Sequence, residues 1–324
     1  MAGETERGAA LLTVLLLVAV VAVMAATALE KMRVATRLGG NAIALDQARA
    51  YAQAAETLAI VKVSDVLRRD ASRVSLAGGW SNRPFPLPIP GGTAVARVSD
   101  GGNCFNLNSL VTRDSDGKNV AYAPAMAQFA RLTRLIDVPG GAGIAAAAAD
   151  WIDSDDVALP GGAEDAAYAA RDTPYRTAGT LMADPSELRA VAGVTPEAYE
   201  RLRPWICTLP QAGRSVINVN TLTPEQAPLF AMLLPDTLGV AGARAVLLRR
   251  PAGGYDKAAD VWNAPSLSGA MPDDQAKAQL DVTSRWFALR IDVAVGQTTL
   301  EEHALIDARA LPARLVSRQW GAAS

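Results

Sequence analysis

The chain has 324 residues, 50% of them apolar and 5% aromatic, so it can bury a hydrophobic core over about two domains. Its net charge of −2 gives no electrostatic footprint of a protein that binds nucleic acid backbones. One histidine, His303, and two cysteines, Cys104 and Cys207, are too few for a zinc site of the usual Cys/His type. We expect the two cysteines to form one disulfide if this part of the chain lies in an oxidising compartment; the alternative is two buried free thiols.

Residues 9–29 form an uncharged run of 21 residues, long enough to span a bilayer as a helix. Three interpretations compete: a signal anchor, a secretory signal cleaved after Ala28, and a prepilin-type leader. An apolar secretory region usually has about 7–15 residues, which is shorter than this run. The polar head MAGETERG ends in Gly8 directly against the run, and this resembles a prepilin peptidase site. Cleavage after Gly8 would make Ala9 the new N-terminus.

The charges that flank the run favour the opposite membrane orientation to that of a processed pilin. Arg7 stands alone before the run, whereas Lys31, Arg33 and Arg37 follow it. Cationic residues collect on the cytoplasmic side of membrane helices. The charges alone therefore place the C-terminal side in the cytoplasm, and a pilin-type subunit requires the reverse.

The first part of the chain predicts a helix followed by strands. We expect the membrane helix to run through Arg37 and to break or bend at Gly39-Gly40, because glycine is unfavourable in a helix interior. A second helix is predicted from Leu45 to Arg69. Its small apolar residues recur every three or four positions, which suits packing on a sheet; they are Leu45, Ala48, Ala52, Ala55 and Ala59.

Strand patterns then appear on both sides of a long helical block. The Pro/Gly-rich stretch 83–92 predicts a loop. Alternating residues predict strands, with a turn at 100–103; the strands are 93–98, 104–110, 285–295, 298–307 and 311–320. Residues 123–280 have a helical pattern broken by Pro and Gly. This order predicts a helical block inserted into a helix-plus-sheet domain.

Several phrases in order along the chain resemble one family. They are ERGAALL at 6–12, NCFNLNSL at 103–110, DWIDSDD with PGGAED within 150–165, PYRTAG at 174–179, SELRAVAGV at 186–194 and INVNT at 217–221. Each phrase is weak by itself, whereas the ordered set is fairly specific. The chain resembles the K subunit, a minor pseudopilin of bacterial type II secretion systems.

This resemblance implies an α+β, pilin-like fold, in which a long N-terminal transmembrane helix packs on a small antiparallel sheet and a large all-helical domain is inserted. The segments would be a leader (1–8), the membrane span (9–29), the pilin-like helix with the first strands (30–122), the insertion with SAM-like or helix-hairpin-helix-like units (123–282), and the last strands (283–324). The subunit would be held in the inner membrane by a single span, with its globular part in the periplasm.

The resemblance also implies a structural role and not an enzymatic one. The subunit would sit at the pseudopilus tip, help to initiate the pseudopilus and assist export of folded proteins. Its partners would be prepilin peptidase, the I and J subunits and the secreted cargo. Most pilins and pseudopilins carry Glu at mature position five, which is thought to pair with the N-terminus of the preceding subunit. Thr13 holds that position here, as expected of a K subunit at a tip.

An acidic segment is the candidate metal site. Six carboxylates lie within the 16 residues from Asp150 to Asp165, and Ca²⁺ takes six to eight oxygen ligands in flexible geometry. The resemblance implies calcium in this region. Our first choices as ligands are Asp153, Asp155, Glu164 and Asp165, with Asp150 and Asp156 as further candidates. The alternative is a solvated acidic loop that caps helices.

A second functional hypothesis is a membrane-anchored DNA receptor of the competence type. Residues 217–221 and 238–250 resemble a helix-hairpin-helix unit, in which Arg244, Arg249 and Arg250 could contact phosphates. The acidic balance of the whole chain counts against nucleic acid as a partner. For catalysis, the sequence offers no G-x-S-x-G motif and no P-loop, and His303 lies in a predicted strand.

Overall fold

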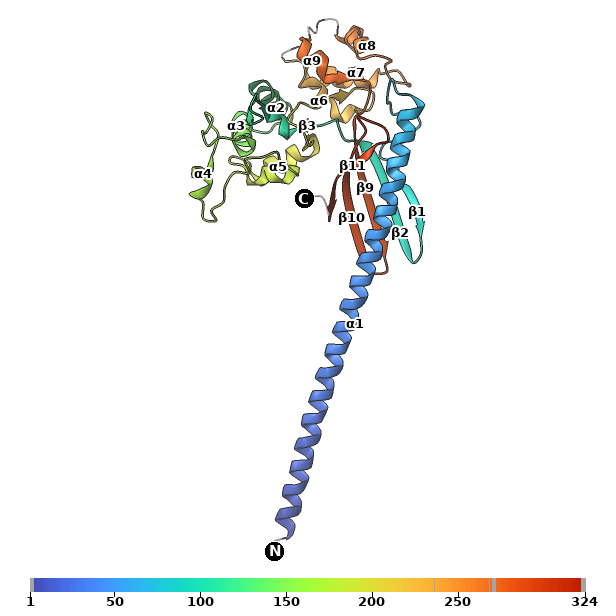
Figure 1. The fold of residues 1–324 in the computed structure, drawn as a ribbon, viewed down its shortest axis with the longest axis vertical. Coiled ribbons are helices and arrows are strands. Elements are labelled where there is room, and N and C mark those ends of the chain that lie inside the picture. Colours follow the sequence, from blue (N-terminus) through green and yellow to red (C-terminus); the bar gives the residue numbers. More distant parts are fainter. Residues whose placement is uncertain (1–2, 236, 268, 270–271, 322–324) are drawn as a thin grey trace.

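The computed structural model describes residues 3–235, 237–267, 269 and 272–321, with the side chains of these residues from residue 9 onward, Ser266 excepted. Residues 1 and 2 of the predicted leader lie outside the described residues. Figure 1 shows a long helical stalk that carries a head of one antiparallel sheet and a separate group of short helices.

Helix α1 (Gly3–Arg69) forms the stalk and one layer of the head. Its apolar run is unburied, and by length and composition it can cross a membrane. The expected break at Gly39-Gly40 is wrong, because the helix continues through both residues. A Cβ added at either glycine would meet no atom within 4 Å. No close neighbour therefore requires glycine at these positions, and each glycine costs the continuous helix about 1 kcal/mol relative to alanine.

The C-terminal half of α1 packs on a five-stranded antiparallel sheet of order β1-β2-β9-β10-β11. The predicted alanine stripe is confirmed, since Ala48, Ala52 and Ala55 are at most 1% exposed and contribute to one core with the sheet. The strands are β1 (Phe85–Ile89), β2 (Gly92–Asp100), β9 (Trp286–Val295), β10 (Thr298–Asp307) and β11 (Arg314–Trp320). Strands β9, β10 and β11 lie close to the positions predicted for them.

Strand β1 corrects the prediction that residues 83–92 form a loop. It pairs with β2 from Phe85↔Ala96 to Ile89↔Gly92. Successive N–H groups of a strand point to opposite sides, and proline lacks this group. Pro86 and Pro88 are two residues apart, so their missing N–H groups belong to the same side of the strand. An edge strand tolerates both prolines if this is the side away from β2. The same prolines leave this edge poorly suited to pairing with a further strand.

The inserted block has its own core, which begins earlier than residue 123. Phe105, Leu107 and Leu110 already belong to it, and it ends with Val282. The block is also not all helical, because it contains three short strand pairs. The predicted strand 104–110 is a strand only at Phe105–Asn106, followed by a 3₁₀ turn at Leu107–Leu110.

The remaining elements of the insertion are short and follow in chain order. Its strands are β3 (Phe105–Asn106), β4 (Val111–Arg113), β5 (Asn119–Ala121), β6 (Ile206–Cys207), β7 (Ile217–Asn218) and β8 (Leu280–Asp281). Its α-helices are α2 (Ala123–Leu135), α3 (Gly141–Ile152), α4 (Asp165–Ala169), α5 (Pro196–Leu202), α6 (Ala227–Ala231), α7 (Val240–Leu248), α8 (Ala258–Trp262) and α9 (Asp274–Gln279).

A buried charge cluster fastens the edge strand β11 to α1. Arg318 of β11 bonds both carboxylate oxygens of Glu56 of α1, with Nη2 2.5 Å from Oε2. Glu302 of β10 is fully buried beside them, and Arg318 Nε lies 3.8 Å from its Oε1. Burial and the adjacent Glu56 carboxylate raise the pKa of Glu302 to about 8. Glu302 is therefore protonated at neutral pH.

Replacing Glu302 by Gln should flatten the pH dependence of stability. The unfolded chain releases this proton near pH 4.5 and the folded chain near pH 8. The stability contributed by the carboxyl group is thus present below about pH 4.5 and lost as the pH rises to about 8. The melting temperature of Glu302→Gln in detergent should exceed that of the wild type by a margin that grows across this window, toward the roughly 4 kcal/mol that a pKa shift from 4.5 to about 8 implies.

The matched control is Glu200→Gln. This glutamate of α5 is exposed and lies 3.9 Å from Arg203. The control should keep the wild-type slope between pH 4.5 and 8. A constant difference between Glu302→Gln and the wild type over the whole window would contradict the assignment.

Candidate functional site

Three buried carboxylates meet at the C-terminal end of α3. Asp150, Asp153 and Glu164 are 0%, 3% and 6% exposed, and each offers an oxygen within 4.8 Å of the others. Helix α3 fixes the first two, because its alanine-rich turns from Ala145 to Ala149 are buried in the core of the insertion. A loop through Pro160-Gly161-Gly162 then returns the chain to Glu164, as the turn residues there predicted.

Backbone groups of the returning loop hold Asp150. Its two carboxylate oxygens accept from Leu159 N at 3.3 and 3.2 Å. A Cβ on Gly162 would lie 2.0 Å from Asp150 Oδ2, so only glycine allows the loop to approach this closely. The loop is therefore built around the carboxylate.

The other two carboxylates lack partners for most of their oxygens. Asp153 Oδ1 and both Glu164 oxygens are buried and accept no hydrogen bond in the described part of the chain. Burial, then the charges of Asp155 and Asp150, raise the pKa of Asp153 to about 7. Burial, then Asp153 and Asp150, likewise raise the pKa of Glu164 to about 7. Unpaired buried carboxylates are costly, and a cation would remove this cost.

The donor set fits a hard divalent cation. Three carboxylates supply three to six oxygens, and Ca²⁺ completes such a set with backbone carbonyls or water. The cluster offers neither a nitrogen nor a sulfur ligand, which zinc and copper sites usually contain.

The structure brings together only part of the predicted ligand set. Asp155 and Asp156 are exposed, and Asp155 Oδ1 accepts from Val157 N at 2.8 Å. Asp165 is directed elsewhere, because its Oδ1 accepts from the backbone N and the hydroxyl of Thr177 at 2.9 and 3.0 Å. Adjacent carboxylates such as Glu164 and Asp165 can point in opposite directions, which the sequence alone did not distinguish.

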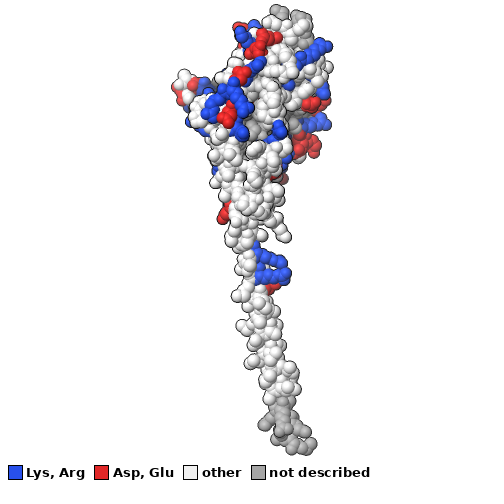
Figure 2. All heavy atoms as spheres, turned by 90° about the vertical axis from the view of Figure 1, so that its right-hand side faces the viewer, with Lys and Arg blue, Asp and Glu red and all other residues white. Residues whose placement is uncertain are grey.

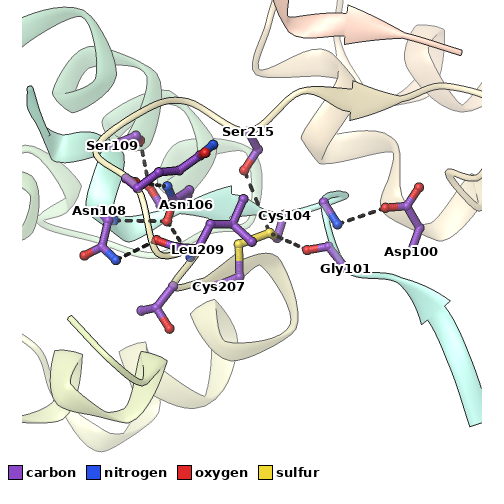
Figure 3. Close-up of a disulfide and its surroundings, with 12 residues drawn as sticks. Asp100, Gly101, Cys104, Asn106, Asn108, Ser109, Cys207, Leu209 and Ser215 are labelled. Atoms are coloured by element: carbon purple, nitrogen blue, oxygen red, sulfur yellow. Dashed lines mark hydrogen bonds between the residues drawn. A yellow bond between two sulfur atoms is a disulfide. The ribbon is translucent and has the colours of Figure 1, made fainter. Parts of the chain in front are cut away.

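The two cysteines lie where the insertion begins (Figure 3). Cys104 and Cys207 are joined in a disulfide with a Cα–Cα distance of 5.8 Å. Next to it, β3 and β6 pair in parallel from Phe105↔Ile206 to Asn106↔Cys207. The disulfide thus ties the first strand of the insertion to a segment about a hundred residues further along the chain.

Two asparagines explain the phrase NCFNLNSL, which is one of the segments that resemble the family. Asn106 Oδ1 accepts from Leu209 N at 2.9 Å, and its Nδ2 donates to the carbonyls of Gln211 and Gly213 (Figure 3). Asn108 donates to the carbonyls of Met182 and Leu209, both at 2.9 Å. Each amide side chain satisfies the backbone of a loop that has no secondary structure of its own.

A cluster of polar side chains joins the insertion to the sheet, and the sequence patterns did not predict it. Asp100, at the end of β2, accepts from the hydroxyls of Thr221 and Ser284, both at 2.5 Å, and from Gly102 N at 2.8 Å. Asn218 donates to Val74 O at 2.9 Å and to Ser284 Oγ at 2.8 Å. The phrase INVNT therefore forms a structural joint. The feature of the sequence that could have predicted this joint is the concentration of polar residues within otherwise apolar segments.

The arginines of the DNA-binding hypothesis are largely committed within the protein. Arg250 Nη1 donates to the carbonyls of Val219 and Leu222, both at 2.7 Å. Arg244 lies 3.6 Å from a carboxylate oxygen of Glu225. Arg249 is exposed. Arg250 is therefore committed to the backbone of its own domain, whereas Arg244 and Arg249 lie on the surface.

Thr13 lies on the apolar part of α1, and its hydroxyl has a partner within the helix. Its Oγ1 donates to Ala10 O at 2.8 Å. The side chain at this position is therefore neutral and satisfied by its own helix. Gly8 lies within the backbone of α1, and Ala9 is exposed.

Comparisons with known proteins agree with this arrangement. Two family models described as type II secretion system protein K match residues 103–211 and 217–283. The type II secretion system protein K of Pectobacterium carotovorum subsp. carotovorum is 34% identical over 98% of this chain and 97% of its own length. The protein K of Klebsiella pneumoniae is 35% identical over 98% of this chain and 97% of its own length.

A solved structure shows the same fold. It is a chain of the crystal structure of the GspK-GspI-GspJ complex from the type 2 secretion system of enterotoxigenic Escherichia coli. The TM-score is 0.74 at 32% identity, over 85% of this chain and 96% of that chain. The long helix, the antiparallel sheet and the helical insertion are therefore the pilin-like fold with an inserted domain. The chain belongs to the type II secretion system protein K family.

Proposed function

We propose that this protein is a structural subunit at the tip of the type II secretion pseudopilus, where it assists initiation of the pseudopilus and export of folded proteins across the outer membrane. The position of the insertion carries this proposal. Its helices project from the end and flank of the pilin-like sheet (Figure 1). A subunit inside a fibre has neighbours above and below, whereas a tip subunit leaves space for such a bulky domain.

The stalk supports the same role. In this proposal the apolar half of α1 anchors the chain in the inner membrane and the head lies in the periplasm, where a disulfide is stable. Thr13 offers no carboxylate to the N-terminus of another subunit, and its hydroxyl bonds within its own helix. A subunit at the top of the assembly needs no such pairing.

The partners follow from the relative of known structure, which is solved in a complex with GspI and GspJ. We propose that I and J subunits bind this chain through their N-terminal helices and globular domains, and that cargo contacts the exposed head. Prepilin peptidase would process the leader before assembly.

The tip position predicts a restricted distribution in assembled pseudopili. An epitope in the exposed turn at 114–117 of the insertion should be labelled by immunogold at one end of overproduced pseudopili. Deletion of the gene should lower secretion and the number of pseudopili, and the epitope-carrying chain should restore both. Labelling along the whole fibre length would contradict the tip position.

Processing by prepilin peptidase predicts a mature chain that starts at Ala9, which mass spectrometry of the purified protein measures. Gly8→Phe should leave the leader attached, because a large side chain at the cleavage position blocks the peptidase, and should abolish secretion. Gly3→Phe is the matched control within the leader and should be processed normally. A mature protein that starts at Leu29 would identify a secretory signal instead.

We also propose that Asp150, Asp153 and Glu164 bind Ca²⁺. When bound, the ion would offset most of the negative charge of the three carboxylates and fasten the loop at 157–164 to the end of α3. The unpartnered buried oxygens of Asp153 and Glu164 support this proposal, because a site without a cation keeps charges that destabilise the fold.

The calcium site predicts two opposite effects of one substitution. Above pH 7, where the carboxylates of Asp153 and Glu164 ionise, Glu164→Gln should raise the melting temperature in EDTA because it removes repulsion. With saturating calcium the order should reverse, since the wild type gains roughly 3 kcal/mol at a hundredfold excess over Kd. Differential scanning calorimetry of the full chain in detergent measures both.

Asp156→Asn is the control for charge alone, because this exposed carboxylate lies outside the cluster. It should keep the full calcium-dependent rise in melting temperature. Equal rises for Glu164→Gln and the wild type would exclude the cluster as the site.

A further inference from the structure

An apolar groove lies between the last turns of α1 and the start of β1. Its volume is about 460 Å³. Its walls include Leu58 and Val66 of α1 and the aromatic rings of Trp80 and Phe85. Leu58 and Phe85 are each 48% exposed at its mouth. The floor contains Phe287 of β9, which packs 5.6 Å from the ring of Trp80.

The charges around this groove are unbalanced. Lys62, Arg69 and Arg83 line it and make neither an ion pair nor a hydrogen bond among the described residues. Asp65 also lines the groove, but its carboxylate bonds Arg68 at 2.9 Å. The rim therefore presents three unpaired positive charges. Figure 2 shows this side of the head, where Lys and Arg side chains lie among Asp and Glu in the upper part and the surface below them is mostly uncharged.

The geometry limits what can fill the groove. Leu58 follows Leu29, the end of the apolar run, by 29 residues, a rise of about 43 Å along an α-helix. In a membrane-anchored chain the lipids therefore lie beyond reach. The prolines of β1 also disfavour an added strand at this edge. What remains is a protein segment that binds through its side chains, such as an amphipathic helix.

We infer that the groove binds a helical segment of a neighbouring pseudopilin, whose apolar side chains enter between Leu58 and Phe85 and whose flanking carboxylates pair with Lys62, Arg69 and Arg83. This inference rests on the proposed function, because assembly through N-terminal helices would bring a neighbour alongside α1. The partner segment should therefore combine large apolar residues with Asp or Glu on its flanks.

Charge reversal of the rim tests the inference. The full chain in detergent is titrated with the I and J subunits of its own secretion system, and binding is measured by biolayer interferometry at low and high salt. The triple variant Lys62→Glu, Arg69→Glu, Arg83→Glu should lose about tenfold or more in affinity for one subunit, about 1.4 kcal/mol. Leu58→Ser should weaken the same interaction without changing the charge.

The matched control is the triple variant Arg113→Glu, Lys118→Glu, Arg249→Glu, which changes three exposed cations of the insertion by the same amount. It should bind like the wild type, and equal circular dichroism melts should verify folding of all variants. Unchanged affinity of the groove variants would overturn the inference and leave the proposed function standing. Failure of the wild-type chain to bind either subunit would overturn both.

Discussion

The packing of α1 on the sheet through small side chains is the contact on which the rest of the molecule depends. Ala48, Ala52 and Ala55 let the helix backbone approach β9 and β10, and larger residues there would hold the two layers apart. The same helix continues without a break from Gly3. One continuous element therefore links the apolar run to the head and sets the height of the groove and the insertion above that run.

The insertion does not disturb the packing of α1 on the sheet, because the chain leaves and re-enters the sheet at one place. The chain departs at Asp100 of β2 and returns at Trp286 of β9, and Asp100 pairs with Phe287 in the register of these neighbouring strands. A domain whose ends lie close together can be inserted without disturbing the host sheet. The side chains of Asp100 and Asn218 then hold the junction through hydrogen bonds to both units.

Among the described residues, the carboxylates beside α3 and the cations beside the groove are not balanced by opposite charges, and each group favours a partner outside the chain. The buried carboxylates beside α3 repel one another and have oxygens without donors, so they favour a cation. The three cations beside the groove lack anions, and they surround an apolar surface. By contrast, Glu56 and Arg318 are satisfied within the head, where they join β11 to α1.

Local sequence patterns by themselves determined many of the helices and strands of this protein. The apolar run, the alanine stripe and the strands at 285–295 and 298–307 were predictable because helix and strand periodicity is local. The sequence also indicated the acidic region. Tertiary structure alone decided that Asp150 joins Asp153 and Glu164 while Asp165 bonds Thr177, because side-chain direction depends on how the loop folds back. It likewise made residues 85–89 an edge strand, since prolines are acceptable only where one side of a strand is unpaired.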